Sequence, residues 1–531
     1  MRMSQCLAWF EALAGTRRGA VVLFAVALAV FAVQSIAMPV AGGRDFGSYL
    51  AYYVQMWDSR PANLTPLVAR TPIAPLAIGV PLDIGGVATV VWMALLYAGS
   101  VIAWSWVALS FGRRAALATA ALLLLYPGYG ILFHGLSSDP IFAAAFAGWA
   151  VLLTRATLRP SWPRFLLVGL GIAFLAGIRP GNQVLALFVV FPFLLAGQWR
   201  SRLTWVAALL AGIVIPLGAL AVNNGVRYGN YGVAGGASTF GLFRMFVTDR
   251  IIQPENGRVS REFARGVNRY LLPEEPYRSY GITSDEFFSS GSLRMQADVG
   301  WVANRLWGDA AEGKLRALMW EAISSHPGAY TTGVSRSMWD LLWRLRLWVP
   351  VASSGDGGDS GSRAGAGGVV NVGGRSLPRP TEGEPIPAPH GGQVWTSPTE
   401  HHPILSPAGV AASEVLLREV GRLEQRVPVH DDSPGLAHRL NQASRWYPAP
   451  LVWLALGLLG IAFRRPRRML LALALPAAAL LVLLLTSLGF FAVAQYVVPV
   501  VPAFILVAAA GLVGEREPDE RGELGTAALT Q

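Results

Sequence analysis

The chain of 531 residues contains one cysteine, Cys6, and one lysine, Lys314. A single thiol can form neither an intramolecular disulfide nor a thiolate metal site. Schiff-base and lysine-nucleophile chemistries have only one candidate residue. Charged residues make up 14% of the chain, well below the roughly 25% of an ordinary soluble domain. These shortages exclude a disulfide-stabilised secreted domain and argue against a soluble enzyme.

Hydrophobic residues, in contrast, make up 53% of the chain and gather in long runs. Ten runs approach the roughly 20 residues that a membrane-spanning helix needs, namely 20–40, 87–110, 115–133, 138–155, 164–178, 181–197, 203–222, 449–463, 469–486 and 490–513. The sequence therefore predicts an all-α polytopic membrane protein with the lipid bilayer as a partner. The net charge of +11 is then a property of the loops, and no nucleic-acid partner is predicted.

Arginines are distributed unevenly over the loops between these runs. One alternating set of loops contains Arg2, Arg17, Arg18, Arg113, Arg114, Arg155, Arg159, Arg164, Arg200, Arg202, Arg464, Arg465, Arg467 and Arg468. Cytoplasmic loops carry the excess of basic residues. We therefore expect a cell-membrane protein with both termini in the cytoplasm, and with residues 41–70 and 223–446 on the extracytoplasmic side.

The composition divides the chain into five parts. We expect an N-terminal transmembrane module of seven helices at 1–222, an extracytoplasmic segment at 223–348, a linker at 349–446, a C-terminal module of three helices at 447–513 and a cytoplasmic tail at 514–531. Residues 353–408 are rich in Gly, Ser and Pro, a composition that cannot bury enough apolar area to order itself. We expect this stretch to be flexible and one isolated amphipathic helix to follow it at 412–426.

The extracytoplasmic segment is predicted to contain helices at 260–270, 298–324 and 328–347. The last of these places Trp339 and Trp343 along one side, with arginines beside them. This pattern suits a helix that lies in the membrane interface. It equally suits an amphipathic helix of a small soluble domain, and the sequence leaves both readings open.

The predicted spans are nearly free of ionisable residues, which argues against a transporter or proton pump. The notable polar residues lie instead at the outer ends of the spans, and they are Arg44, Asp45, His134, Asp139, Arg179, Gln495 and Tyr496. The topology brings them to one membrane face, where a lipid-linked substrate and a water-soluble acceptor can meet.

Three of these residues have a simpler reading as well. Ser138 or Asp139, followed by Pro140, matches the start of a helix, where the Asp139 carboxylate can serve as the cap. Asp45 has no obvious helix start beside it, which leaves an exposed loop carboxylate as its alternative. Arg179 precedes Pro180 and can be a turn residue that extends to the interface.

Several short motifs resemble those of the GT-C glycosyltransferases. These motifs are "GGRDFGSYL" after the first span, "LSSDP" at the start of the fourth, "GIRPGN" between the fifth and sixth, "AISSHPGAY" and "QYVVPVVPAFIL". The most similar branch is that of the bacterial relatives of protein O-mannosyltransferases and lipid A aminoarabinose transferases. The resemblance covers spans one to seven and the final span.

This resemblance implies an inverting transfer of a sugar from a polyprenyl-phosphate donor to an extracytoplasmic acceptor, which is a glycan, lipid or protein. It implies catalytic roles for Asp45 and Asp139, with Asp45 as the base, and donor phosphate binding by Arg44 and Arg179. The residues that it implies as substrate-lining are Tyr49, Tyr53, His134 and Tyr496.

Two positions depart from the family pattern. Phe46 follows Asp45 where many relatives carry a second acidic residue, so a divalent metal is not supported and no cofactor is predicted. Gln495 stands before Tyr496 where relatives often have arginine. Two other functions stay open, a non-catalytic membrane scaffold of the same architecture and a transporter or flippase.

Overall fold

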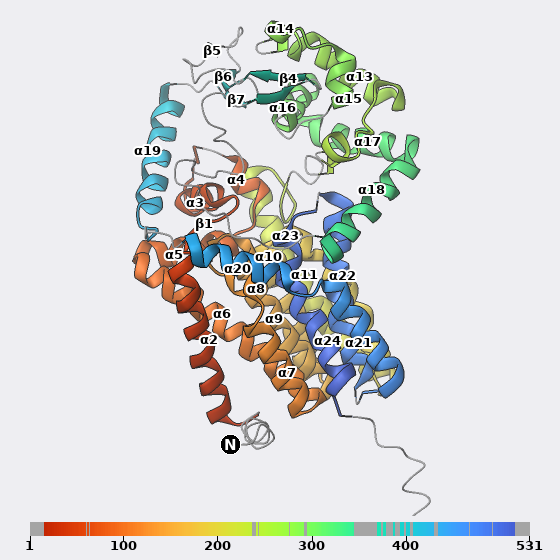
Figure 1. Cartoon of the computed structure of the whole chain (residues 1–531). Helices are drawn as coiled ribbons and strands as arrows, with labels where there is room; N and C mark the ends of the chain where they lie inside the picture. The colour runs from red at the N-terminus through yellow and green to blue at the C-terminus, as the bar shows by residue number, and fades with distance from the viewer. Residues whose placement is uncertain are drawn as a thin grey trace, which may run out of the picture.

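The structure is a computed structural model (Figure 1). It describes residues 15–59, 61–62, 64–235, 241–242, 244–274, 277–290, 295–344, 369–372, 375–378, 386–387, 393–397, 400–403, 407–428, 434–466, 468–490 and 492–515. The predicted cytoplasmic tail beyond residue 515 and most of the predicted flexible stretch 353–408 lie outside the described residues.

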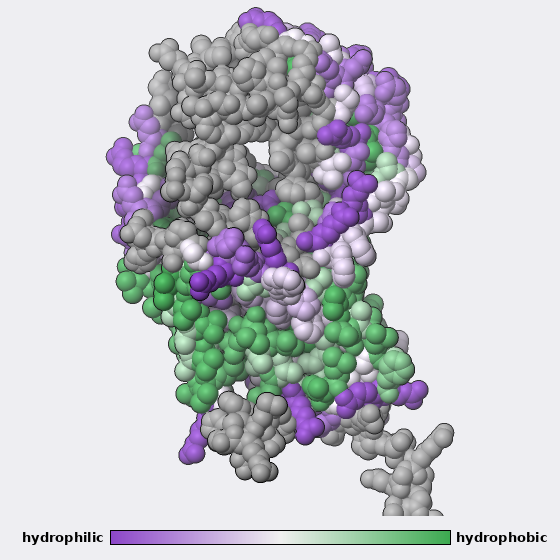
Figure 2. Space-filling view, viewed as in Figure 1, coloured by the Kyte–Doolittle hydropathy of each residue, from purple (hydrophilic) through white to green (hydrophobic). Residues whose placement is uncertain are grey.

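Seven helices within the described residues are long and apolar enough to cross a membrane, and they are Arg17–Ala37, Gly86–Phe111, Ser138–Leu158, Trp199–Tyr228, Gly435–Arg464, Met469–Gly489 and Ala494–Val513. On the visible face they form a continuous hydrophobic belt with hydrophilic residues above and below it (Figure 2). The prediction of an all-α polytopic membrane protein is confirmed. The number of ten spans is not, because three of the expected spans are shorter or interrupted.

The N-terminal part contains α2 (Arg17–Ala37), β1 (Ala41–Gly42), α3 (Phe46–Gln55), α4 (Leu64–Ala69), α5 (Ile73–Ile84), α6 (Gly86–Ala108), η1 (Leu109–Phe111), α7 (Arg113–Leu124), α8 (Pro127–Leu132), β2 (Gly135–Leu136), α9 (Ser138–Leu158), α10 (Trp162–Ile178), η2 (Pro180–Leu194) and α11 (Trp199–Tyr228). The predicted span 115–133 is divided between α7 and α8. Tyr126 is extended (φ −91°, ψ 97°), because the following Pro127 disfavours the helical region for the residue before it.

The outer segment follows with η3 (Arg244–Thr248), η4 (Pro254–Asn256), α13 (Arg258–Gly266), η5 (Val267–Leu271), α14 (Tyr277–Tyr280), α15 (Ser284–Ser290), α16 (Met295–Trp307), η6 (Gly308–Ala310), α17 (Ala311–Ser325), α18 (Pro327–Trp339) and η7 (Asp340–Arg344). It has its own hydrophobic core around Phe263, Phe287 and Leu318. The single helix predicted at 298–324 is wrong, because the chain turns at Gly308, whose φ of +54° favours glycine.

The helix predicted at 328–347 is present as α18 and η7. It lies against the outer end of α22, where the Tyr330 hydroxyl donates to the carbonyl of Leu488 at 2.8 Å. Trp339 and Trp343 are 47% and 43% exposed, with ring centroids 5.8 Å apart. This position beside a candidate span suits the interfacial reading of the helix, which stays a prediction.

The remaining elements are β3 (Val369–Val372), β4 (Arg375–Pro378), β5 (Ile386–Pro387), β6 (Gln393–Ser397), β7 (Glu400–Pro403), α19 (Pro407–Glu424), α20 (Pro434–Trp446), α21 (Pro450–Arg464), α22 (Met469–Gly489), α23 (Ala494–Val497), η8 (Val498–Val500) and α24 (Val501–Val513). Strands β3 and β4 pair antiparallel, as do β5, β6 and β7. Only one helix was expected in 349–446, and α20 is a second.

The described ends of the chain lie at the same end of the helix bundle (Figure 1). The amide of Glu515 donates to the carbonyl of Phe111 at 2.7 Å, and Gly15 lies beside Leu109 of the same short helix. We call the opposite end, which carries residues 244–344, the outer end. The expected cytoplasmic location of both termini stays a prediction.

Helices α21 and α24 pack closely because glycines line their contact. A Cβ on Gly460 would lie 2.5 Å from the backbone carbon of Gly511. Small residues allow such close approach between membrane helices. We expect Gly460→Ala to lower the stability of the purified protein by about 1–3 kcal/mol, seen as a lower Tm. Gly99→Ala in α6 is the matched control, because a Cβ there meets nothing within 4 Å; equal Tm values for the two variants would contradict this packing.

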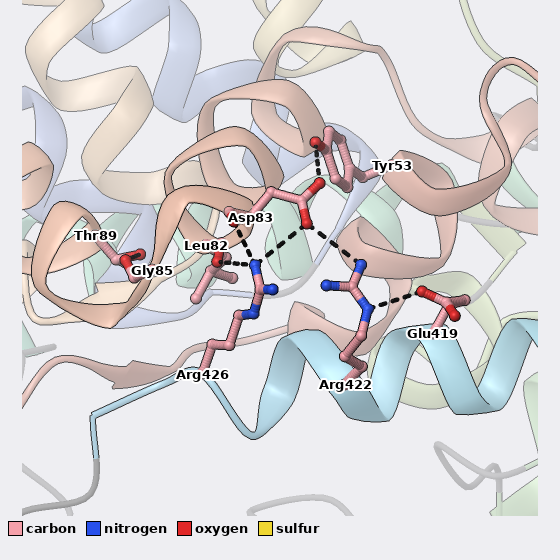
Figure 3. A network of polar contacts seen from close by, with 8 residues as sticks. All are labelled: Tyr53, Leu82, Asp83, Gly85, Thr89, Glu419, Arg422 and Arg426. Carbon is pink, nitrogen blue, oxygen red and sulfur yellow. Dashed lines mark hydrogen bonds and ion pairs between the residues drawn. The ribbon is translucent and has the colours of Figure 1, made fainter.

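The predicted isolated helix at 412–426 is present but not isolated. Helix α19 packs on α3 and α5 and buries Leu416, Val420 and Leu423. Figure 3 shows how Asp83, at the end of α5, holds it: Arg422 and Arg426 lie 3.3 and 3.4 Å from Asp83 Oδ1. Arg426 also donates to the backbone carbonyls of Leu82 and Asp83. The helix was expected to be isolated because a sequence pattern shows an apolar side but not its partner.

Asp83→Leu is expected to release α19. The carboxylate is about two-fifths exposed, so each contact contributes only about 0.2–1 kcal/mol. Losing these contacts should raise the fraction of molecules with α19 detached severalfold. We expect trypsin to cut after Arg422 and Arg426 severalfold faster than in the wild type, measured by mass spectrometry of timed digests. Glu419→Gln is the control, because Glu419 contacts only Arg422 of its own helix among the interactions of Figure 3; equal acceleration by both variants would contradict the role of Asp83.

Candidate active site at the outer end of the helix bundle

A two-residue parallel bridge joins the loops that carry the two predicted carboxylates. Ala41 pairs with Gly135, and Gly42 pairs with Leu136. The amide of Gly43 also donates to the carbonyl of Leu136 at 3.2 Å. A Cβ on Gly43 would lie 3.1 Å from that carbonyl oxygen, so a glycine suits this close approach. The "GG" of the first motif therefore sets the distance between the two loops.

Asp45 stands at the N-cap position of α3, so the expectation that no helix starts beside it is wrong. Its side chain nevertheless makes no capping hydrogen bond, and its φ of 60° is uncommon for a residue other than glycine. The carboxylate instead lies 3.0 Å from Nη2 of Arg70 and 3.9 Å from Nε of Arg44. It is 39% exposed, and it stays accessible while it is paired.

Arg70 was not among the predicted site residues. It lies 25 positions after Asp45 in the sequence, and its contact depends on how α3 and α4 fold back on each other. Burial lowers the pKa of Arg70, but the neighbouring Tyr49 and Asp45 side chains outweigh this effect and raise the pKa above its ordinary value. Arg70 therefore stays charged beside the carboxylate.

Asp139 does not cap the helix that it was expected to start. Ser137 is the N-cap residue of α9, and its hydroxyl accepts from the amide of Asp139 at 3.2 Å. The Ser137 hydroxyl donates to Oδ2 of Asp139 at 3.0 Å. Asp139 is 5% exposed and forms an ion pair with Nη2 of Arg179. A carboxylate in the first turn of a helix is also stabilised by the helix dipole. Because Ser137 is the cap residue, the Asp139 carboxylate can bind Arg179.

Arg179 ends α10 and is directed into the protein, so its reading as a turn residue that extends to the interface is wrong. Its side chain is 18% exposed. Besides the ion pair with Asp139, its Nε donates to the hydroxyl of Ser138 at 2.9 Å. Its guanidinium carbon lies 5.4 Å from the ring centroid of Phe142 and 5.6 Å from that of Tyr496.

Tyr49 connects the two carboxylate–arginine pairs. Its hydroxyl donates to Oγ of Ser138 at 2.9 Å, and Arg70 lies over its ring at 5.1 Å. Ser138 thus accepts from both Tyr49 and Arg179. Through this serine, which was not among the predicted site residues, α3 and the end of α10 are both hydrogen-bonded to the start of α9.

Tyr496 of the last span and Phe490, which follows α22, contribute aromatic rings to the same cluster. The guanidinium carbon of Arg44 lies 5.2 Å from the ring centroid of Tyr496 and 5.4 Å from that of Phe490. Since Arg179 also lies over Tyr496, this ring has a guanidinium group from each of two separate loops beside it. Such contacts hold cations in place without neutralising them.

The structure therefore brings together six of the eight predicted site residues: Arg44, Asp45, Tyr49, Asp139, Arg179 and Tyr496. Tyr53 has another partner, because its hydroxyl donates to Oδ2 of Asp83 at 2.8 Å (Figure 3). His134 is 1% exposed, with its ring nitrogens 3.1 Å from Ser35 Oγ and from the carbonyl of Gly130. Both side chains thus have their hydrogen-bond partners outside the cluster, and their substrate-lining roles stay predictions.

A buried arginine of the outer segment fixes the loop that carries Phe490. Arg244 is 0% exposed and pairs with Asp249 at 2.8 Å. Its Nη1 donates to the carbonyls of Phe490, at 2.8 Å, and Ser487, and to the hydroxyl of Ser337 at 3.2 Å. Arg244 thereby connects the outer segment to Phe490, whose ring lies beside Arg44. No motif or spacing in the sequence pointed to Arg244.

The cluster combines three guanidinium groups with two carboxylates of unequal exposure. Asp139 is nearly inaccessible, whereas Asp45 is 39% exposed. An excess of cations suits an anionic group such as a phosphate, and an accessible carboxylate can accept a proton. Among the described residues there is no group of three or more His, Cys, Asp and Glu side chains that could hold a metal ion.

No family model and no curated protein matches the chain. Among solved structures, the chain is similar to the crystal structure of ArnT from Cupriavidus metallidurans bound to undecaprenyl phosphate, with 15% identity and a TM-score of 0.31 over 94% of this chain and 78% of that chain. A TM-score of 0.31 does not establish a shared function, so the function is inferred from the residues of the site.

Proposed function

We propose that the protein transfers a sugar from a polyprenyl-phosphate donor to an extracytoplasmic acceptor. The observation that supports this most is a cluster of three arginines beside the accessible carboxylate of Asp45. Arg44 and Arg70 lie against Asp45 itself, whereas Arg179 pairs with Asp139 and shares the Tyr496 ring with Arg44. The cluster forms at the outer end of an apolar helix bundle. A donor with a long hydrocarbon tail partitions into a bilayer, and its phosphate then lies at the depth of such a cluster.

The reaction needs a base because an acceptor hydroxyl is a weak nucleophile while it retains its proton. In this proposal Asp45 accepts that proton as the hydroxyl oxygen forms a bond to the anomeric carbon. The bond between the anomeric carbon and the phosphate oxygen breaks, and the phosphate leaves with the electron pair. One displacement from the opposite side inverts the anomeric configuration.

The arginines stabilise the charge that develops on the leaving phosphate. Arg44 and Arg179 lie on the Tyr496 ring, which suits two contacts to one phosphate. Asp139 is a positioning residue in this scheme, because it is buried and holds Arg179. Arg70 is placed to orient Asp45 at 3.0 Å. Tyr49, beneath Arg70, offers a ring at the side of the sugar.

A direct assay tests the proposal. Purified full-length protein in lipid nanodiscs is incubated with a panel of radiolabelled polyprenyl-phosphate sugars and an extract of cell-envelope glycans, lipids and proteins. We expect label from one donor to enter the acceptor fraction, with inverted anomeric configuration in the isolated product. Label that crosses the bilayer of proteoliposomes without any covalent product would instead support a flippase, and it would contradict the proposal.

A further inference from the structure

A second group of cations lies on the outer segment. Four arginines recur along α13 and η5 at spacings of three, four and four residues, and they are Arg258, Arg261, Arg265 and Arg269. Residues at such spacings share one side of a helix, and all four are exposed. The opposite side of the helix buries Phe263 and Val267 in the core of the segment. We call the four arginines the arginine stripe.

The stripe continues into a stack of alternating arginines and aromatic rings. Arg269 lies 5.2 Å from the ring centroid of Tyr270. Arg305, from α16, lies 5.5 Å from the same ring and 5.6 Å from the ring of Trp301. Arg305 is exposed, and both rings are half-buried. The rings are thus held at the surface by residues of two packed elements.

Nearby carboxylates offset only part of the charge of these arginines. None of the five forms an ion pair with a residue that the structure describes. Glu262, the one glutamate between Arg258 and Arg269, interacts with the charge of Arg258, but its oxygens accept from Lys314 at 3.1 Å and from Nε1 of Trp307 at 2.8 Å. Glu321 accepts from the backbone amides of Val259 and Ser260. A local excess of unneutralised cations attracts anions.

The position of the stripe excludes the bilayer surface as its partner. Helices α13 and α16 lie at the end of the molecule away from the helix bundle (Figure 1). On the visible face, the hydrophobic belt is confined to the bundle (Figure 2). Lipid headgroups flank that belt, so they do not reach α13.

The alternation of rings and guanidinium groups suits a charged sugar chain. An aromatic ring packs on the apolar side of a sugar ring, and a guanidinium group binds a carboxylate or phosphate by paired hydrogen bonds. The stripe alone extends over about 16 Å, at 1.5 Å per helical residue, which spans several residues of an extended chain. A neutral sugar would use the rings but not the arginines.

We propose that the arginine stripe, with Tyr270, Arg305 and Trp301, binds an anionic polysaccharide that carries carboxylate or phosphate groups. This inference deepens the proposed function, because it names the class of the acceptor. The surface would hold the acceptor chain outside the site while one of its hydroxyl groups reaches Asp45.

Binding by the full-length protein in nanodiscs tests the proposal without any transfer reaction. The probe is a linear polyuronate oligosaccharide, titrated by calorimetry against a neutral glucan of the same length, an oligonucleotide of the same charge and anionic vesicles. We expect the polyuronate to bind most tightly and its Kd to rise with salt, because exposed charges are screened. Arg269→Ala with Arg305→Ala should raise that Kd about tenfold or more. Arg316→Ala, an exposed arginine of α17 paired with Glu312, should leave it unchanged.

Tighter binding of the oligonucleotide or the vesicles, or an unchanged Kd in the Arg269→Ala/Arg305→Ala protein, would overturn the proposal. Asp45→Asn separates it from the proposed function, because that variant should keep polyuronate binding even where transfer is lost. A wild-type protein that binds polyuronate but transfers no sugar would contradict only the proposed function. A protein that transfers sugar but binds no polyuronate would contradict only the acceptor class.

Discussion

Asp45→Asn is expected to lower the rate of sugar transfer by about 100-fold or more. Asparagine keeps the shape of the side chain and can still accept from Arg70, which lies 3.0 Å from the Asp45 carboxylate. It cannot take a proton from the acceptor hydroxyl. Because the Asp45 side chain makes no capping hydrogen bond to α3, the start of this helix should be unaffected. Initial rates of the purified variant, compared at equal amounts of folded protein, measure the effect.

Asp139→Asn provides the matched control, since it changes a carboxylate of the same cluster. The start of α9 should persist, because Ser137 caps it. The change removes the charge that holds Arg179, so the expected effect is a higher KM for the donor with a smaller loss in kcat. Near-normal kcat in Asp45→Asn would place the base elsewhere. A loss in kcat as large for Asp139→Asn as for Asp45→Asn would contradict the separate roles.

The sequence was sufficient to predict several of the residues that meet at the outer end. Arg44, Asp45, Asp139, Arg179 and Tyr496 each lie next to the end of an apolar run, and alternating helices return all these ends to one side. The prediction thus depended on topology, which hydropathy reveals well. It did not depend on any particular contact.

The partners within the site could not be predicted in this way. Tyr49 and Tyr53 are four residues apart and were expected to share one role, yet Tyr49 binds Ser138 while Tyr53 binds Asp83. Which neighbour each side chain meets depends on helix packing. Arg70 was missed for the same reason, because no spacing rule connects it to Asp45. The observed cap of α9, Ser137, lies one or two positions before the expected Ser138 or Asp139, a shift that a Ser-Ser-Asp sequence leaves open.

Arg244→Met is expected to destabilise the protein by about 3–5 kcal/mol, the usual effect of removing one partner of a buried ion pair. Arg244 and Asp249 are 0% and 2% exposed, so the remaining carboxylate would be left without its main partner. The variant also loses the hydrogen bonds to the carbonyls of Ser487 and Phe490. Thermal unfolding of the purified protein measures the change. Arg336→Met is a milder control, because Arg336 acts on Asp249 only through its charge.

The pH dependence of this variant identifies the cause. Burial raises the pKa of Asp249, and the hydrogen bond and charge of Arg244 act against this effect. Without Arg244 the pKa should rise further above the unfolded value of about 3.9. The folded variant then binds more protons than the unfolded chain, so its stability should fall as the pH rises from 4 towards the raised pKa. Arg244→Met/Asp249→Asn should remove this pH dependence and recover part of the stability. If the double variant retains the pH dependence, or if Arg244→Met unfolds like the wild type, the buried pair does not stabilise this junction.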